Sequence, residues 1–216
     1  MKEVTCHRQK GCCSNVVAPR IAIIDSGGAN IASLLYAFKR LEVDAQLSSD
    51  AEQIRQADGV LLPGVGAAGD AMSRLRQNGL VDVIRDLEQP VLGICLGMQL
   101  LADGSEEEDV ECLGVIPGIV TKLPASPSCP APNMGWCTID QVTQHSILES
   151  VPDGSHFYFL HSYALPPGDH TVATSEHAVS FSAIVSYNNF VAAQFHPERS
   201  SAPGAQILRN FVRSIS

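Results

Sequence analysis

Four short apolar runs, separated by turns and helical patterns, place the tightest limit on how the first hundred residues can fold. The runs span 20–25, 43–47, 59–62 and 90–94. One helical pattern starts at Asn30, a good helix-capping residue, and another fills 71–87. Strands that alternate with helices need crossover connections, which produce a mostly parallel sheet with helices on both faces. The first half of the chain therefore predicts an α/β fold.

Past Gly118 the pattern changes to a series of short strand-like runs. They span 119–123, 136–139, 156–160, 172–175, 183–186 and 190–194. We expect these runs to form an antiparallel extension of the sheet. A last helical pattern at 205–215 presents Ile207, Leu208, Phe211 and Val212 inward. Since no repeat or linker interrupts the chain, we expect one domain over 20–216 and a flexible extension over 1–19.

The charge and the cysteines exclude several classes of protein. A formal net charge of −9 argues against a nucleic-acid binder, which normally carries a basic patch. No apolar run approaches the roughly 18 residues that a membrane span needs. The seven cysteines are an odd number without a C-x-x-C pair, which favours a reducing cytoplasm over a secreted disulfide framework. The spacing of Cys6, His7, Cys12 and Cys13 matches no common zinc pattern, so we expect no metal site.

The segment Gly93-Ile94-Cys95-Leu96-Gly97 carries the clearest chemical signal. A nucleophile between two glycines, after a buried strand and before a helix, matches the elbow of hydrolases. Such a turn lifts the side chain to the carboxyl edge of the sheet, where open α/β sheets bind their ligands. A helix beginning near Met98 would favour thiolate over thiol at Cys95. The alternative is a buried, inert cysteine.

His196-Pro197-Glu198 supplies a partner for that cysteine. Residues two apart on an extended segment point the same way, and Pro197 favours an extended segment. His196 would then face Cys95 as general base while Glu198 orients the imidazole, as in a catalytic triad. The alternative is a hydrogen-bonded histidine without a catalytic role.

Pro63-Gly64-Val65-Gly66 ends another expected parallel strand and should reach the same edge of the sheet. Glycine-rich backbone at that edge can present N–H groups to a developing oxyanion. The alternative is a plain turn between a strand and a helix.

With these motifs in place, residues 20–216 resemble the class I glutamine amidotransferases, and among them the glutaminase subunits of imidazole glycerol phosphate synthase. The opening IIDSGGANIASL resembles that family's D-x-G-x-x-N pattern, with Asp25, Gly27 and Asn30 in place. The other motifs are LLPGVG (61–66), PVLGICLGMQLL (90–101), FYFLHSYA (157–164) and QFHPERSSAPGAQILRNF (194–211). The resemblance implies a single domain of the class I glutamine amidotransferase type.

The resemblance also implies a reaction. Cys95 would attack the side-chain amide of glutamine, giving a γ-glutamyl thioester and ammonia, while His196 moves protons and Glu198 holds His196. No cofactor is implied. The implied substrate contacts are the amides of Leu96, Gly64 and Val65 for the oxyanion, and Gln99 with the backbone of His161, Ser162 and Tyr163 for the amino-acid end.

The implied partner is the cyclase subunit of imidazole glycerol phosphate synthase, a (β/α)₈ protein that would form a heterodimer with this chain. It would use the ammonia to make imidazole glycerol phosphate and AICAR in histidine biosynthesis. The resemblance places Asn30 and Trp136 at the interface. The chain departs from the family's P-H-x-G-W-N pattern, with Asn133 and Cys137 replacing histidine and asparagine. If these two residues flank Trp136 at the interface, their replacement should alter communication with the partner more than the chemistry at Cys95.

Other interpretations of the sequence stay open. A stand-alone γ-glutamyl hydrolase, or the glutaminase subunit of another amidotransferase, would use the same fold with a similar cysteine and histidine. A binding subunit with an idle thiol would react slowly and unselectively at Cys95. An α/β-hydrolase places its acid between nucleophile and histidine, whereas the best acid here, Glu198, follows His196.

Overall fold

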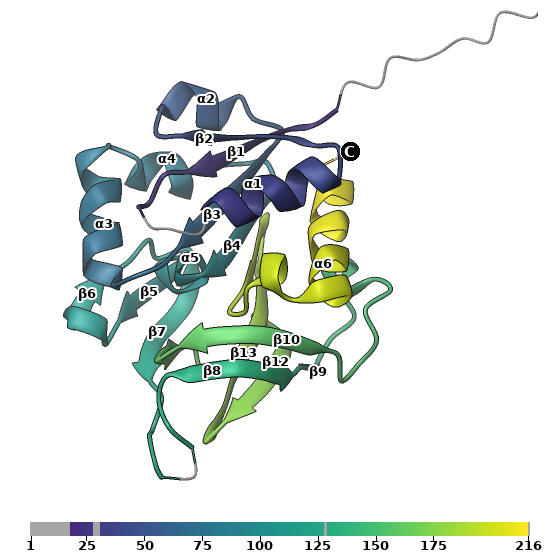
Figure 1. The fold of residues 1–216 in the computed structure, drawn as a ribbon. Coiled ribbons are helices and arrows are strands. Elements are labelled where there is room, and N and C mark those ends of the chain that lie inside the picture. The colour runs from purple at the N-terminus through teal and green to yellow at the C-terminus, as the bar shows by residue number, and fades with distance from the viewer. Residues whose placement is uncertain (1–17, 28–30, 128, 216) are drawn as a thin grey trace, which may run out of the picture.

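The computed structural model describes residues 18–27, 31–127 and 129–215. Among these residues, eight strands form the central sheet (Figure 1). Across the sheet they are β2 (Asp44–Ser48), β1 (Arg20–Ile24), β3 (Gly59–Gly64), β4 (Val91–Cys95), β14 (Phe190–Ala193), β13 (Val179–Tyr187), β12 (Thr171–His177) and β9 (Asp140–Gln141). Neighbours are parallel from β2 to β14 and antiparallel from β14 to β9. The predicted α/β fold with a mostly parallel sheet is confirmed.

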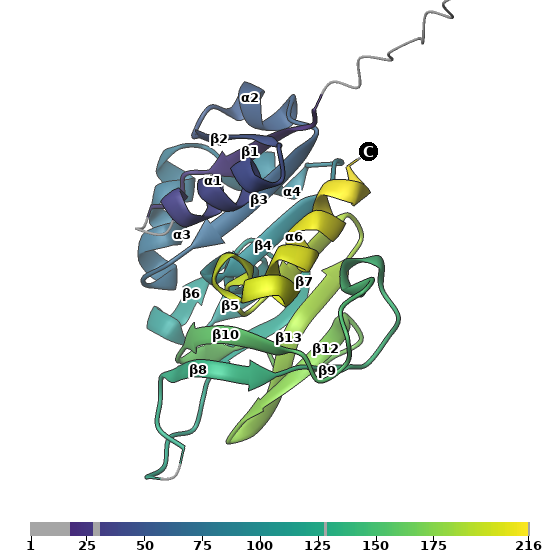
Figure 2. The same ribbon diagram turned by 45° about the vertical axis from the view of Figure 1, so that its right-hand side comes forward.

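Helices cover both faces of this sheet (Figures 1 and 2). One face packs against α1 (Ile31–Arg40) and α6 (Ser201–Ser214). The other packs against α2 (Ala51–Arg55), α3 (Ala68–Gln77), α4 (Val81–Arg85) and α5 (Leu96–Leu100). Strand β1 shows why the run RIAII suits this position. Its alternate residues enter different cores, Ile21 and Ile23 on one face and Ala22 and Ile24 on the other.

The helices differ in three details from the sequence prediction. The pattern at 71–87 forms two helices, because the chain turns between them at Gly79, which adopts a φ of +65°. Helix α2 was not predicted, and Asp50 caps it by accepting a hydrogen bond from the backbone nitrogen of Gln53 at 2.8 Å. Helix α5 begins at Leu96, directly after Cys95, and not near Met98.

The predicted antiparallel extension is only partly correct. Strands β9, β12 and β13 do extend the sheet, whereas β14 lies parallel to β4. Strands β8 (Asn133–Thr138) and β10 (His156–His161) form a separate antiparallel pair. A third sheet contains β11 (Tyr163–Ala164), β7 (Ile116–Lys122), β5 (Ala102–Ser105) and β6 (Val110–Glu111). Local alternation predicts a strand, but contacts distant in sequence decide which neighbour it pairs with.

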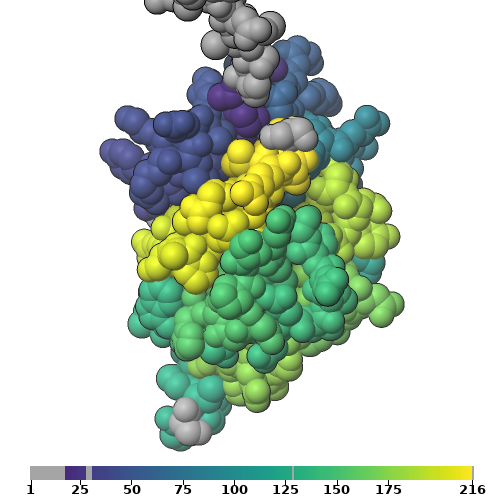
Figure 3. Space-filling model, turned by 90° about the vertical axis from the view of Figure 1, so that its right-hand side faces the viewer, coloured from purple at the N-terminus to yellow at the C-terminus, as the bar shows by residue number. Residues whose placement is uncertain are grey.

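Helix α6 lies across the surface beside α1 and the green segment that includes the short 3₁₀ helix η2 (Ser146–Leu148) (Figure 3). Asn210 joins α6 to this segment, because its buried side-chain nitrogen donates to the carbonyl oxygens of Ile147 and Glu149, both at 2.8 Å. Within the described ranges, no helix is long and apolar enough to cross a membrane.

Part of the predicted N-terminal organisation cannot be placed. Residues 1–17 of the predicted extension, with Cys6, His7, Cys12 and Cys13, lie outside the described residues. Asn30, the predicted helix cap and interface residue, also lies outside them.

Candidate active site

Cys95 lies at the carboxyl end of β4 in a backbone conformation that few residues adopt. Its φ of +54° and ψ of −111° turn the chain sharply into α5. The flanking glycines are required by close packing. An added Cβ at Gly93 would lie 2.9 Å from the Cβ of Ala192, and one at Gly97 would collide with the carbonyl oxygen of Leu62. Strained backbone of this kind costs on the order of 1–3 kcal/mol and is concentrated at functional sites.

His196 and Glu198 form a buried pair beside Cys95. Nδ1 of His196 lies 3.0 Å from Oε1 of Glu198, and their side chains are 5% and 0% exposed. The predicted extended segment is wrong, since Pro197–Arg199 is a 3₁₀ turn, η3. The two side chains meet because His196 itself is extended, with φ −99° and ψ 96°, and the turn brings Glu198 back toward its ring.

The charge state of His196 follows from its neighbours. Burial on its own lowers the pKa of the imidazole, but the hydrogen bonds and charges of Cys95 and Glu198 outweigh burial and raise the pKa to about 10. The imidazolium is therefore stable at neutral pH when Cys95 has given up its proton. Nδ1–H of His196 points to Glu198, which leaves Nε2 for exchange with the sulfur.

Ser200 holds the backbone of His196 in place. Its hydroxyl donates to the carbonyl oxygen of His196 at 2.7 Å and accepts from the backbone nitrogen of Tyr158 at 2.9 Å. The backbone nitrogen of His196 also donates to the carbonyl oxygen of Tyr158 at 2.9 Å. Because Ser200 is fully buried, these bonds fix the turn that carries His196 and Glu198 to strand β10.

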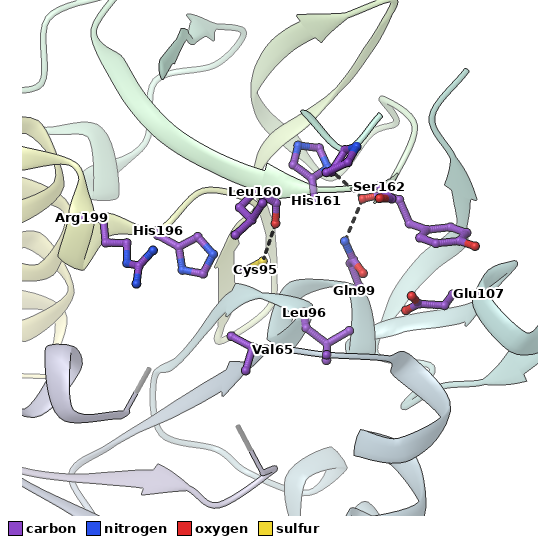
Figure 4. A pocket seen from close by; sticks show the side chains of 13 residues that line it. Val65, Cys95, Leu96, Gln99, Glu107, Leu160, His161, Ser162, His196 and Arg199 are labelled. Atoms are coloured by element: carbon purple, nitrogen blue, oxygen red, sulfur yellow. Dashed lines mark hydrogen bonds between the residues drawn. The ribbon is translucent and has the colours of Figure 1, made fainter. Parts of the chain in front are cut away.

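A pocket of about 440 Å³ opens above Cys95 (Figure 4). His196 and Gln99 lie on opposite sides of the sulfur, and Glu107 lies beyond Gln99 (Figure 4). The thiol donates to the carbonyl oxygen of Leu160 at 3.7 Å. Other lining residues are Val65, Gly66, Leu96, Pro132, His161, Ser162, Tyr163 and Arg199. Among the described residues, no cluster of three or more His, Cys, Asp or Glu side chains is placed to hold a metal ion.

Most residues predicted to bind substrate line this pocket, but Gly64 does not. Gly64 pairs with Cys95 in the β3–β4 register and lies close to Leu96. Gln99 is nearly buried, and its side-chain nitrogen donates to the carbonyl oxygen of Tyr163 at 2.8 Å and to Oε1 of Gln194 at 3.1 Å. Both N–H groups of Gln99 are thus engaged, and only its oxygen is left for a ligand.

Asn133 and Cys137 lie on the face of β8 opposite to Trp136, so they do not flank its exposed ring. They point inward from β8, whereas Trp136 lies on the outer face, where its ring makes an edge contact with Tyr158. The side-chain nitrogen of buried Asn133 lies 3.1 Å from Nε2 of His161, a residue that lines the pocket. Successive residues of a strand point to opposite faces. Asn133 and Cys137 are four residues apart and therefore share a face, whereas Trp136 points to the other one.

Sequence reasoning missed several residues of the site. Glu107 sits in an acidic run, which by itself indicates only a solvated turn. Arg199 and Ser200 follow directly after the predicted dyad, so the motif contained them without showing what they contact. Gln194 precedes His196 by two residues, and its side-chain nitrogen lies 3.9 Å from the sulfur of Cys95. Its position two residues before His196 was the one signal in the sequence that its side chain could point to the same side as His196.

Comparison with known proteins identifies the family of the chain. Residues 22–215 match the family model of the class I glutamine amidotransferases. The chain is 50% identical to the imidazole glycerol phosphate synthase subunit HisH of Xanthomonas axonopodis pv. citri, over 89% of this chain and 96% of the relative. It is 47% identical to the HisH subunit of Pasteurella multocida, over 90% of this chain and 98% of the relative.

Solved structures support the fold independently. The crystal structure of a glutamine amidotransferase superposes with a TM-score of 0.70 at 18% identity, covering 90% of this chain and 98% of that one. PurLQS of Thermotoga maritima superposes with a TM-score of 0.70 at 15% identity, covering 93% and 100%. The chain belongs to the class I glutamine amidotransferase family and, within it, to the HisH subunits of imidazole glycerol phosphate synthase.

Proposed function

We propose that this chain is the glutaminase subunit of an imidazole glycerol phosphate synthase. It hydrolyses glutamine to glutamate and ammonia and supplies the ammonia to a cyclase partner in histidine biosynthesis. The observation that carries the proposal is a pocket lined by Cys95, His196 and Glu107, in which the buried carboxylate of Glu198 holds His196 from behind. Its compartment is the cytoplasm, where the Cys95 thiol stays reduced.

The reaction has two steps that share one proton carrier. The sulfur of Cys95 attacks the amide carbon of the glutamine side chain, and a carbon–sulfur bond replaces the carbon–nitrogen bond. His196 takes the thiol proton and gives it to the departing nitrogen, which leaves as ammonia. Water then attacks the thioester, and His196 passes the proton of the water to the sulfur, releasing glutamate. Glu198 stabilises the imidazolium that both steps require.

The far end of the pocket suits the amino-acid end of glutamine. An α-ammonium group needs an anion or acceptors, and Glu107 supplies a carboxylate there. Gln99 offers only its oxygen, as another acceptor, because its N–H groups are engaged with Tyr163 and Gln194. The backbone at 161–163 is assigned to the α-carboxylate.

The oxyanion of the tetrahedral intermediate is assigned to backbone N–H groups at the turn of the elbow. Leu96 is the first residue of α5, and Val65 follows the end of β3 beside it; both line the pocket. The pairing of Gly64 with Cys95 keeps the two turns together. The 64–66 segment is the element that a partner would reorder, so the isolated chain is expected to be a weak glutaminase.

An exposed apolar patch beside the pocket fits the cyclase partner. Met134 and Trp136 of β8 and Leu160 of β10 are exposed on the outer face of the two-stranded sheet. Leu160 also lines the pocket, so the patch is continuous with the catalytic site. A contiguous exposed apolar patch marks an interaction surface. A partner docked here lies at the mouth from which ammonia departs.

The test is glutamate formation from glutamine by the isolated chain and by the chain mixed with the cyclase partner and its nucleotide ligand. We expect weak activity alone and stimulation of roughly 5- to 150-fold in the mixture. Full activity without a partner would instead favour a stand-alone γ-glutamyl hydrolase.

A further inference from the structure

A buried side-chain amide reaches the sulfur of Cys95 from the neighbouring strand. Gln194 follows β14 directly and is fully buried. Its Nε2 lies 3.9 Å from the sulfur, and its Oε1 accepts from Nε2 of Gln99 at 3.1 Å. Gln99 lies on the side of Cys95 opposite His196 (Figure 4). The sulfur therefore has a buried amide donor within reach in addition to the imidazole of His196.

One backbone carbonyl dictates how both amides are oriented. The carbonyl oxygen of Tyr163 can only accept, so the group of Gln99 that lies 2.8 Å from it must be the nitrogen. The second N–H of Gln99 then faces Gln194, which must present its oxygen. The nitrogen of Gln194 is left facing Cys95. If the amide oxygen and nitrogen of Gln194 were exchanged, its N–H₂ group would face the N–H₂ group of Gln99. Its carbonyl oxygen would then face the sulfur of Cys95.

The carbonyl of Tyr163 is itself held from the other side. Burial lowers the pKa of His161 to about 4, so its imidazole is neutral and has a single N–H. The side-chain nitrogen of Asn133 donates to Nε2 of His161 at 3.1 Å, and the thiol of Cys137 donates to Oδ1 of Asn133 at 3.5 Å. The one N–H of His161 is therefore on Nδ1, 2.9 Å from the oxygen of Tyr163.

The contact with Gln194 favours one charge state of the sulfur. As a thiol, Cys95 donates its proton to the carbonyl oxygen of Leu160 and gains little from a neutral N–H. As a thiolate it has no proton to donate, and that carbonyl oxygen then faces a negative charge. The N–H of Gln194 becomes a charge-assisted donor in this state, and such bonds are shorter and about twice as strong as neutral ones.

We propose that Gln194 is a positioning residue for the nucleophile, which holds the Cys95 thiolate through Nε2 in an orientation imposed by Gln99 and the Tyr163 carbonyl. This inference rests on the proposed nucleophilic role of Cys95.

The test is the pH dependence of Cys95 alkylation by iodoacetamide in the full chain, followed by mass spectrometry of the Cys95 peptide. Gln194→Met removes the donor at similar volume, and we expect the pH of half-maximal rate to rise by about one unit. Gln194→Glu should raise it further, because a carboxylate then faces the sulfur. The titratable groups around the sulfur stay unchanged in both variants: His196, Glu198, Arg199, Glu107, His161 and Tyr163.

Two further variants separate this role from general damage to the core. Ser182→Ala changes an equally buried polar residue on β13 and should leave the pH profile as in the wild type. Gln99→Met should raise the pH of half-maximal rate when Gln194 is present, and add nothing to Gln194→Met, because it acts through that residue. Circular dichroism of each variant establishes that it is folded.

The outcomes distinguish the two proposals. If both Gln194 variants fold and alkylate Cys95 with the same pH dependence as the wild type, the proposed role of Gln194 is wrong. Such a result would not affect the proposal that Cys95 is the nucleophile. A wild-type Cys95 that reacts slowly at every pH would overturn the nucleophile assignment, and the role of Gln194 with it.

Discussion

Nδ1 of His196 lies 3.0 Å from Oε1 of Glu198 across a 3₁₀ turn, with the imidazole nearly buried and the carboxylate fully buried. This short buried bond makes Glu198 a cause of the raised pKa of His196, beside the hydrogen bond and charge of Cys95. The carboxylate holds Nδ1 of the imidazole and favours its charged form, and in the proposed reaction it exchanges no bond with substrate.

Glu198→Gln should lower the pKa of His196 from about 10, because an amide stabilises the imidazolium less than a carboxylate does. The measurement is the pH titration of the His196 ring proton by NMR. We expect glutaminase kcat to fall on the order of a hundredfold, less than for Cys95→Ala or His196→Ala. A loss equal to that of Cys95→Ala in a folded variant would contradict the orienting role.

The same shift makes stability depend on pH. A raised folded-state pKa stabilises the protein fully below the unfolded value of about 6.5, and this contribution is lost as pH rises through about 10. The free energy of unfolding of the wild type should therefore exceed that of Glu198→Gln. The difference between the two proteins should shrink as the pH rises from about 6.5 to about 10. Urea unfolding at several pH values measures this difference, and a difference that grows with pH would contradict the charged pair.

Cys95→Ala should abolish synthesis that depends on glutamine and leave synthesis from added ammonium largely intact in the complex with the cyclase. The reason is the proposed division of labour, with thiolate chemistry in this chain and ammonia use in the partner. Cys129→Ala, at a partly exposed free cysteine, is the matched control and should support both reactions. Equal loss with both nitrogen sources would mean that Cys95 has a structural role.

Ser200→Ala should lower glutaminase kcat about tenfold and the free energy of unfolding by about 1–3 kcal/mol, since it leaves the backbone nitrogen of Tyr158 without its acceptor and loosens His196. Steady-state kinetics and urea unfolding measure the two effects. Ser201→Ala changes the exposed next residue and should behave as wild type. Equal behaviour of the two variants would show that the turn holds His196 without Ser200.

Asn133→Ala should raise the KM for glutamine, because Nε2 of His161 loses its donor and the pocket wall at 161–163 loses its support. The free energy of unfolding should fall by about 1–3 kcal/mol, as for other buried polar groups left unpaired. Cys137→Ser keeps a donor to Oδ1 of Asn133 and serves as the control. A changed response to the partner with an unchanged KM would restore the interface role first expected for Asn133.

Trp136→Ala should weaken binding of the cyclase partner by about 2 kcal/mol or more, the size expected when a buried aromatic anchor is removed from an interface. Titration calorimetry measures the affinity, and alkylation of Cys95 in the isolated chain should not change. Tyr187→Ala removes an exposed aromatic ring from β13 and is the control. Equal affinity for Trp136→Ala and wild type would place the interface elsewhere.

The sequence by itself determined the α/β fold class and the family of this protein, and it placed Cys95, the proposed nucleophile, at a strand end. These features are local. An apolar run before a glycine turn predicts a strand and an elbow from neighbouring residues alone. The packing that makes the glycines necessary comes from other strands, since Gly93 lies against Ala192 of β14 and Gly97 against the carbonyl oxygen of Leu62 in β3. The pairing of His196 with Glu198 was also within reach, because two residues separated by one other can meet through local geometry alone.

Only the tertiary structure decided which distant groups meet at the sulfur. Gln194 reaches Cys95 and Gln99 because β14 pairs with β4, a contact between strands about a hundred residues apart. Asn133 contacts His161 because β8 pairs with β10, apart from the main sheet. Such pairings depend on burial and backbone hydrogen bonds that the whole fold must satisfy together, and no periodicity within one segment specifies them.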